Sequence, residues 1–327
     1  MSVDKDNFGL VCLKGASQVF FMENAITGAL FFLAIAYSSF TSGNWATAIG
    51  AVLGVIVGTG TARTLKADPQ SYASGLFGFN GILVGIALPT FIANSPELWI
   101  YIFVGASIST IVTSAFSATL TNSWSIPGST GPFVLTAWLL LAGAYGFGSL
   151  HVVGEAPKLA TDYALGTVSI PNPLELLQIF FRNIGQVYLL GDWISGVIIL
   201  VGIFIASPIA GMAAVGGSII ALLTVLIMRA DPSVVSQGLY GFSPVLTAIA
   251  LGTVFLKPSG YVFIYAAFAT VATVFMQSAL DVIMAPTGLP TYTAPYVLTL
   301  YLFIAPKSRA TPHPHSPVGA NFLMDDK

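Results

Sequence analysis

The chain carries one stretch twice: ADPQSYASGLFGFNGILVGIAL at residues 67–88 returns, altered, as ADPSVVSQGLYGFSPVLTAIAL at residues 230–251. Eleven of the 22 aligned residues are identical, at an offset of 230 − 67 = 163. Residues 126–142 (IPGSTGPFVLTAWLLLA) and 289–305 (LPTYTAPYVLTLYLFIA) keep this offset and share eight of 17 residues. Ordered matches of this kind predict an internal duplication.

A third match lies upstream of both pairs. Gln18 and Gln186 stand in the segments 17–20 and 185–188, at an offset of 186 − 18 = 168. Because all three matches occur in the same order, we predict two copies of one unit about 160 residues long.

The composition indicates that these copies lie in a membrane. Of 327 residues, 55% are hydrophobic and 7% are charged, whereas a soluble domain carries roughly 25% charged residues. So few charges cannot cover a solvated surface, and we expect most of the chain to face membrane lipid or itself. The net charge of −2 gives no reason to expect a nucleic acid partner. The single Cys12 excludes a disulfide framework and a cysteine metal cluster within the chain.

Apolar runs of bilayer length predict an all-α polytopic membrane protein, with about five transmembrane helices and one short re-entrant half helix in each repeat. Glycines in the 67–91 run predict a short helix ending near Phe77, then a turn and a second helix. The expected spans are near 24–40, 45–61, 98–120 and 132–147, and near 193–206, 209–228, 245–255, 261–285 and 295–306. The expected domains are a first repeat at 1–148, a linker at 149–176, a second repeat at 177–306 and a disordered cytoplasmic tail at 307–327.

The number of spans predicts how the two repeats are threaded. An odd number makes the second copy enter the membrane from the opposite side, so we predict inverted repeats with a pore between them. With the N-terminus inside, eight Lys and Arg residues fall on inner segments and three on outer segments, which agrees with the positive-inside rule. Without the residues of both tails, three Lys and Arg residues fall on inner segments and three on outer segments. The prediction of cytoplasmic termini therefore depends on the charges in the tails.

The polar side chains expected in or near the spans are mostly neutral. No histidine falls within a span, which argues against a proton relay, a buried metal and general acid–base catalysis. Asp281, near the end of its span, is expected to be a capping or packing carboxylate. Exposed backbone at broken helices is tolerated in a membrane only where it lines a cavity. These features predict a pathway for a small uncharged polar solute.

Matched motifs in the two copies carry a family resemblance. They are the Gln-Val pairs at Gln18 and Gln186, the Gly-Phe pairs at Phe79 and Phe242, and a Pro-x-x-Thr-x-Pro-aromatic element in each half. With these motifs, residues 13–305 resemble the urea transporter family, whose most specific element is LPxxTxPF. Here Ile126 and Tyr296 depart from that element but keep its apolar and aromatic character.

The resemblance implies a homotrimer with one pore per subunit, which passes urea down its gradient without a coupling ion or cofactor. It also implies the inner (plasma) membrane of a bacterium. In the family, planar urea is held between aromatic rings in two narrow slots. Phe21 and Phe79 would build one slot and Phe242 the other, with Trp193 where a further aromatic is expected.

The same resemblance implies a row of oxygen acceptors along the slots. The side chains of Gln18 and Gln186 and the carbonyls of Val19 and Val187 would form this row. Two further matched pairs complete the implied urea-contacting residues: Thr130 and Thr293 at the narrow centre, and Leu83 and Leu246 in the apolar walls.

Other functions remain as alternatives. Inverted repeats and broken helices also fit a coupled secondary transporter for another neutral solute, although the spans hold no clear buried coupling group. An ammonia channel is expected to place histidines in its pore, and an enzyme needs a nucleophile with a base or a metal cluster. The matched residues also have structural interpretations: lipid-facing or core aromatics, glutamines bonded to nearby backbone, and threonines that cap helices.

Overall fold

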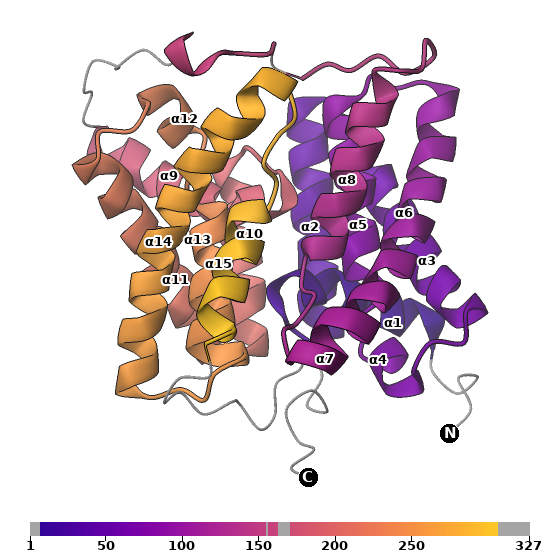
Figure 1. Ribbon diagram of the computed structural model, residues 1–327, viewed down its shortest axis with the longest axis horizontal. Helices are drawn as coiled ribbons and strands as arrows, with labels where there is room; N and C mark the ends of the chain where they lie inside the picture. Colours follow the sequence, from indigo (N-terminus) through magenta and orange to yellow (C-terminus); the bar gives the residue numbers. More distant parts are fainter. Residues whose placement is uncertain (1–6, 155, 163–170, 307–327) are drawn as a thin grey trace. The chain divides into compact units, whose positions relative to one another are not determined.

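The computed structural model describes residues 7–154, 156–162 and 171–306. Regular structure in these ranges is helical, apart from one isolated antiparallel bridge between Ile92 and Val152. The all-α prediction is therefore confirmed. The chain divides into two compact units, and of the described residues unit 1 holds 7–154 while unit 2 holds 156–162 and 171–306 (Figure 1). The segment expected to be a tail, 307–327, lies outside the described residues.

Unit 1 contains the predicted broken helix (indigo to magenta in Figure 1). Its elements are α1 (Phe8–Ser17), η2 (Gln18–Phe20), α2 (Ala25–Ser42), α3 (Trp45–Thr64), α4 (Pro69–Ala73), α5 (Phe79–Phe91), α6 (Pro96–Phe116), η3 (Ser117–Thr121), α7 (Asn122–Trp124) and α8 (Gly131–Ala144). Helix α4 begins after Asp68, whose carboxylate accepts from the N–H of Ser71. It ends earlier than the expected Phe77, and residues 74–78 form the turn before α5.

Unit 2 carries a similar succession of elements. They are α9 (Pro173–Gly185), η5 (Gln186–Tyr188), α10 (Trp193–Ala206), α11 (Pro208–Ile227), α12 (Pro232–Ser236), α13 (Phe242–Ile249), η6 (Ala250–Val254), α14 (Gly260–Met284), η7 (Ala285–Thr287) and α15 (Ala294–Ile304), preceded by η4 (Ala160–Asp162). The π-helix η6 of unit 2 follows α13, whereas the π-helix η3 of unit 1 follows α6. Helix α9 begins inside the segment expected to be a linker. A capping box of Asn172 and Glu175 sets its start, because each side chain satisfies a backbone N–H of the first turn.

The two units also share the positions of their left-handed turn residues. In the described ranges, left-handed φ angles occur at Phe21 and Leu189 (64° and 60°), Lys66 and Arg229 (54° each), Gly75 and Gly238 (84° and 76°), Ser125 and Gly288 (56° and 67°), and Ser129 and Tyr292 (46° and 48°). Within each pair the residues are 168 (first pair) or 163 residues apart, and Gly43 alone lacks a described counterpart. Left-handed non-glycine residues are uncommon, so these pairs indicate one backbone path used in both units.

Within the described ranges, five helical segments are long and apolar enough to cross a membrane. They are Ala25–Ser42, Trp45–Thr64, Pro96–Trp124, Pro208–Ile227 and Gly260–Thr287. A pair bent by 74°, Pro173–Tyr188 with Trp193–Ala206, would make a sixth. Helices such as α5 and α8, with 13 and 14 residues, are shorter than the roughly 20 residues of a straight span. The polytopic membrane class is thus confirmed, while the number of spans per repeat stays a prediction.

Helices α3 and α5 pack backbone against backbone in unit 1. A Cβ on Gly54 would lie 2.2 Å from the carbonyl oxygen of Gly81, and one on Gly85 would lie 2.0 Å from that of Gly50. Small residues permit such close crossings in membranes, where helices gain no hydrophobic free energy by leaving lipid. This crossing positions α5, whose first residue is Phe79.

Candidate solute-binding site

The glutamines of the duplicated motif occupy matched positions, where α1 passes into η2 and α9 into η5. Gln18 is 1% exposed and Gln186 is 7% exposed. Gln18 Nε2 donates to the carbonyl oxygen of Ser74 at 2.9 Å, and Gln186 Nε2 donates to that of Gln237 at 2.9 Å. Since 237 − 74 = 163, the two bonds are equivalent in the repeats. Each ties its glutamine to the turn that follows the short helix.

These bonds determine which end of each amide is available to a ligand. A backbone carbonyl can only accept, so the amide nitrogen must face it and the amide oxygen must face away. Gln18 Oε1 is buried and has no hydrogen-bond partner among the described residues. A buried oxygen without a partner costs roughly 1–3 kcal/mol. Gln18 therefore presents an acceptor that a ligand with N–H groups would satisfy.

Each glutamine begins a short 3-10 helix, η2 or η5, that ends at a residue with a left-handed φ angle. Val19 and Val187 are buried, at 0% and 2% exposure. These short helices end at Phe21 in unit 1 and Leu189 in unit 2, both in the left-handed region. At the glutamine offset, 21 + 168 = 189, so Leu189 is the counterpart of Phe21. Applying that offset to Phe21 would have found Leu189 from the sequence.

Trp193 occupies a different position from the one that Phe21 has. It is the first residue of α10 and follows the N-cap Asp192. Its ring lies 6.4 Å from that of Phe181 on α9, at an interplanar angle of 42°. At the offset of 168 it corresponds to Ala25, the first residue of α2. Trp193 therefore lies where α10 begins, with its ring near Phe181 on α9.

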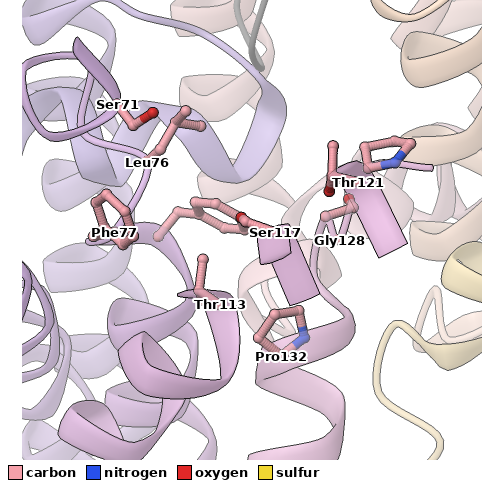
Figure 2. Close-up of a pocket in the computed structure, with 11 residues that line it drawn as sticks. Ser71, Leu76, Phe77, Thr113, Ser117, Thr121, Gly128 and Pro132 are labelled. Atoms are coloured by element: carbon pink, nitrogen blue, oxygen red, sulfur yellow. The ribbon is translucent and has the colours of Figure 1, made fainter. Parts of the chain in front are cut away.

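Phe79 lies at the edge of a pocket in unit 1. It is 6% exposed, and Leu83, one turn later on α5, is 1% exposed. Figure 2 shows hydroxyl side chains of Ser71, Thr113 and Thr121 around this pocket. The other lining residues are Leu76, Phe77, Ser117, Pro127, Gly128, Ser129 and Pro132. The surroundings of Phe79 therefore combine aromatic surface with neutral hydroxyl groups.

Thr130 is the N-cap residue of α8 and is 1% exposed. Its side chain makes no capping hydrogen bond, so the capping interpretation does not apply. Asn80 on α5 binds this helix end instead, because its Oδ1 accepts from the N–H of Phe133 at 3.2 Å. Its Nδ2 donates to Thr113 Oγ1 on α6 at 3.0 Å. One buried amide therefore ties the helix of Phe79 to the turn that carries Thr130.

Unit 2 repeats this arrangement with different side chains. Phe242 and Leu246 are buried on α13, at 5% and 0% exposure. Thr293 precedes α15 with backbone angles of −88° and 15°, close to the −83° and 7° of Thr130. Ser243 stands where unit 1 has Asn80, since 80 + 163 = 243. Its buried hydroxyl has no hydrogen-bond partner among the described residues.

Asp281 belongs to a polar cluster on α14 of unit 2. Its Oδ1 accepts from Gln277 Nε2 at 2.9 Å and from Thr291 Oγ1 at 3.0 Å, and Gln277 also donates to Thr291 at 2.8 Å. These bonds agree with the expected packing role. At the offset of 163, unit 1 has Ala118 instead of a carboxylate. The described ranges hold no group of three or more His, Cys, Asp or Glu residues that could bind a metal ion.

The long apolar helices, with neutral polar side chains buried among them, define a polytopic membrane protein. Residues 10–308 match the family model for urea transporters. The chain therefore belongs to the urea transporter family.

Curated relatives support this assignment. Urea transporter 1 of Capra hircus is 28% identical over 304 residues, which cover 89% of this chain and 75% of that protein. Urea transporter 1 of Rattus norvegicus is 30% identical over 301 residues, with the same two shares. The similarity thus extends over most of both units.

Proposed function

We propose that this protein is a passive channel that conducts urea down its concentration gradient. The observation that carries the proposal is the pair of buried glutamines. The amide nitrogen of each donates to a backbone carbonyl, so the amide oxygen of each faces away from that carbonyl. Membership of the urea transporter family supports urea as the solute.

Urea fits this acceptor chemistry. It has four N–H donors in one plane, and removing an unpaired amide-like group from water costs roughly 2–7 kcal/mol. We infer that the oxygens of Gln18 and Gln186 and the carbonyls of Val19 and Val187 accept these N–H groups in turn. Such a row lowers the desolvation barrier without holding urea tightly at any one step.

The buried apolar residues next to these acceptors suit a flat solute. In the proposal, Phe21 and Phe79 form one slot, and Phe242 forms the second with Leu189 or Trp193. Leu83 and Leu246 complete the apolar walls, and Thr130 and Thr293 line the narrow centre. A hydrated ion would lose its water there without gaining a counter-charge, so ions are excluded.

The proposal also includes an arrangement of the chain in the membrane. The two units would be inverted repeats with the path between them, and both termini would be cytoplasmic. The protein would be a homotrimer in the inner membrane, surrounded by lipid, with one path per subunit. The matched left-handed turns of the two units support the duplication on which this arrangement rests.

Stopped-flow urea flux in proteoliposomes tests the proposal. We expect the protein to move urea much faster than empty vesicles, and uncoupler or Na⁺ removal to leave the rate unchanged. Gln18→Leu removes one acceptor, so the permeability should fall about tenfold, which corresponds to roughly 1.4 kcal/mol. The matched control is Gln70→Leu on α4, where the side chain is exposed, and it should keep the rate. A rate equal to that of empty vesicles would refute the proposed function.

A further inference from the structure

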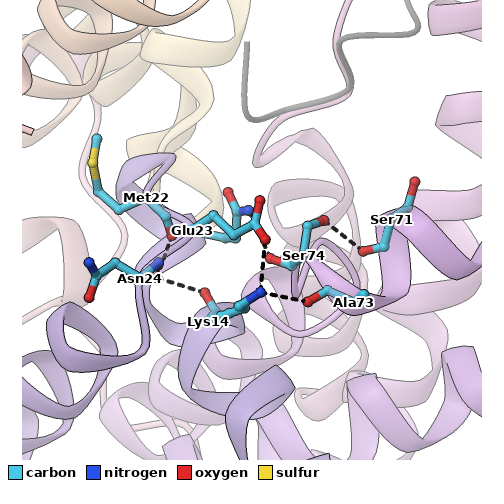
Figure 3. A network of polar contacts seen from close by, with 9 residues as sticks. Lys14, Met22, Glu23, Asn24, Ser71, Ala73 and Ser74 are labelled. Atoms are coloured by element: carbon cyan, nitrogen blue, oxygen red, sulfur yellow. Dashed lines mark hydrogen bonds and ion pairs between the residues drawn. The ribbon is translucent and has the colours of Figure 1, made fainter. Parts of the chain in front are cut away.

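A cationic residue lies one helical turn before each glutamine. In unit 1, Lys14 Nζ donates to the carbonyl oxygen of Ala73 at 3.3 Å (Figure 3). The next carbonyl along the chain, that of Ser74, accepts from Gln18 Nε2. Lys14 and Gln18 therefore bind two consecutive carbonyls at the end of α4. We call this contact between the end of the short helix and the helix that carries the glutamine a joint.

The same pair of bonds occurs in unit 2. Arg182 Nη1 donates to the carbonyl oxygen of Ser236 at 2.8 Å, and Gln186 Nε2 donates to the next carbonyl, that of Gln237. The residues correspond at the repeat offsets, since 182 − 14 = 168 and 236 − 73 = 163. The cationic residue is Lys in unit 1 and Arg in unit 2, but the carbonyl that it binds is at the equivalent position. The same hydrogen bond is therefore made in both units by different side chains.

Both joints also bring backbone against backbone. A Cβ on Gly75 would lie 2.4 Å from the amide nitrogen of Gly15, and one on Gly238 would lie 2.8 Å from that of Asn183. These glycines have left-handed φ angles of 84° and 76°. Each short helix is therefore held directly against the helix that carries the cation and the glutamine.

Helix ends explain why cations occupy these positions. The last carbonyls of a helix have no partner within the helix, and a one-turn helix such as α4 or α12 cannot satisfy its own. A Lys or Arg near a helix C-terminus binds these carbonyls and interacts favourably with the partial negative charge there. Without the cation, the carbonyl that receives the glutamine amide would be less well held.

The two cations differ in their charged surroundings. Lys14 forms an ion pair with Glu23 at 2.8 Å (Figure 3), whereas Arg182 has no ion pair with any described residue. The bond from the cation to the carbonyl is therefore common to both units, whereas the ion pair is found in unit 1.

We propose that Lys14 and Arg182 are positioning residues for the glutamine acceptors. Each holds the end of its short helix, so that the neighbouring carbonyl keeps the glutamine nitrogen and the glutamine oxygen stays turned toward the solute path. This inference rests on the proposed function, because it assigns the two cations a part in the same urea site.

Flux measurements on four variants test this role. Lys14→Met and Arg182→Met keep the aliphatic stem and remove the donors, so urea permeability should fall severalfold. Lys14→Arg and Arg182→Lys keep a donor and should retain most of the wild-type rate, because the native joints already use either residue. Glu23→Gln is a matched control that removes only the ion pair and should leave the rate unchanged. Wild-type rates in both methionine variants would overturn the proposal.

A double-mutant cycle separates positioning from general damage. If Lys14 acts through Gln18, then Lys14→Met should cause no further loss of permeability in a Gln18→Leu background. The same fractional loss in both backgrounds would overturn the proposal.

A second readout does not depend on flux. In Lys14→Met, hydrogen exchange measured by mass spectrometry should become faster in residues 74–79, while the matched residues 237–242 serve as an unchanged internal reference. Unchanged exchange in 74–79 would also overturn the proposed role. If the wild-type protein fails to move urea but exchange changes as expected, the proposed function fails and the structural joint stands.

Discussion

Leu189 and Asp281 are two residues at which the units differ in side-chain chemistry. Unit 1 has Phe21 in the left-handed turn after its glutamine, whereas unit 2 has Leu189 at that point. Unit 2 has Asp281 on α14, whereas unit 1 has Ala118 at the matched point. Each difference leads to a test in which one unit serves as the reference for the other.

Leu189→Phe would give unit 2 the ring that unit 1 already has. We expect the second slot to narrow, so that methylurea permeability falls severalfold relative to urea permeability. Such ratios report wall contacts, because one added methyl group in a close pocket changes binding by about 1–3 kcal/mol. Stopped-flow flux of both solutes measures the ratio.

Trp193→Phe is the matched control for this prediction. It should leave the ratio of methylurea to urea permeability near its wild-type value if Leu189 forms the wall. A change of the ratio in Trp193→Phe together with none in Leu189→Phe would assign the wall to Trp193 instead.

Asp281→Asn should leave urea flux unchanged and still insensitive to uncoupler. The Asp281 carboxylate accepts from Gln277 and Thr291, and the oxygen of an asparagine amide can take both bonds. Asp281→Leu removes the acceptor that Gln277 and Thr291 share, although Gln277 keeps its bond to Thr291, and should lower the free energy of unfolding by about 1–3 kcal/mol. Thermal unfolding in detergent and proteoliposome flux provide the measurements. Loss of flux in Asp281→Asn with normal stability would indicate a transport role for this carboxylate.

At the scale of elements, glycines allow α3 and α5 to cross closely, and this crossing positions the helix that carries Phe79. The broken helix places Phe79 at the start of α5, and glycine contacts with α3 position that helix in unit 1. Unit 2 has Gly217 at the point matched to Gly54, where an added Cβ would lie 2.8 Å from the Cβ of Ala248. Close helix approach is therefore found at the equivalent crossing of α11 with α13.

Gly54→Ala should destabilise the protein, because the new Cβ would lie 2.2 Å from the carbonyl oxygen of Gly81. Overpacking of this kind typically costs about 1–3 kcal/mol, which should appear as a lower thermal unfolding temperature in detergent. Gly60→Ala on the same helix is the control, since a Cβ there meets no atom within 4 Å. Equal unfolding temperatures for the two variants would contradict the crossing.

At the scale of the whole molecule, matched turns provide sites that can test the inverted threading. Lys66 and Arg229 are exposed, lie in equivalent turns after α3 and α11, and share a φ angle of 54°. Inverted repeats must place equivalent turns on opposite sides of the membrane. Repeats threaded in the same direction would place them on one side.

Lys66→Cys and Arg229→Cys, each in a Cys12→Ala background, allow this to be measured with a membrane-impermeant maleimide. In intact cells, Arg229→Cys should react from outside, whereas Lys66→Cys should react only after the membrane is permeabilised. Cys12 itself is buried, so its replacement mainly removes background labelling. Labelling of both variants from the same side would contradict the inverted arrangement.

The sequence alone determined the all-helical membrane class, the two matched sets of motifs and the short helix that begins after Asp68. These features depend on composition, self-similarity and local signals, such as an aspartate cap followed by proline, which act over a few residues. The sequence prediction placed the start of α9 in the linker, although Asn172 and Glu175 form a local capping box that indicates this start.

Only the tertiary structure decided which groups meet. Gln18 binds a carbonyl 56 residues away and Asn80 binds an amide 53 residues away. The left-handed backbone at Phe21 and Leu189 also became visible only in the structure, although the sequence offset already pairs these two residues. Contacts of this kind depend on how helices pack and where buried backbone groups need partners, and a linear pattern of residue types does not specify either.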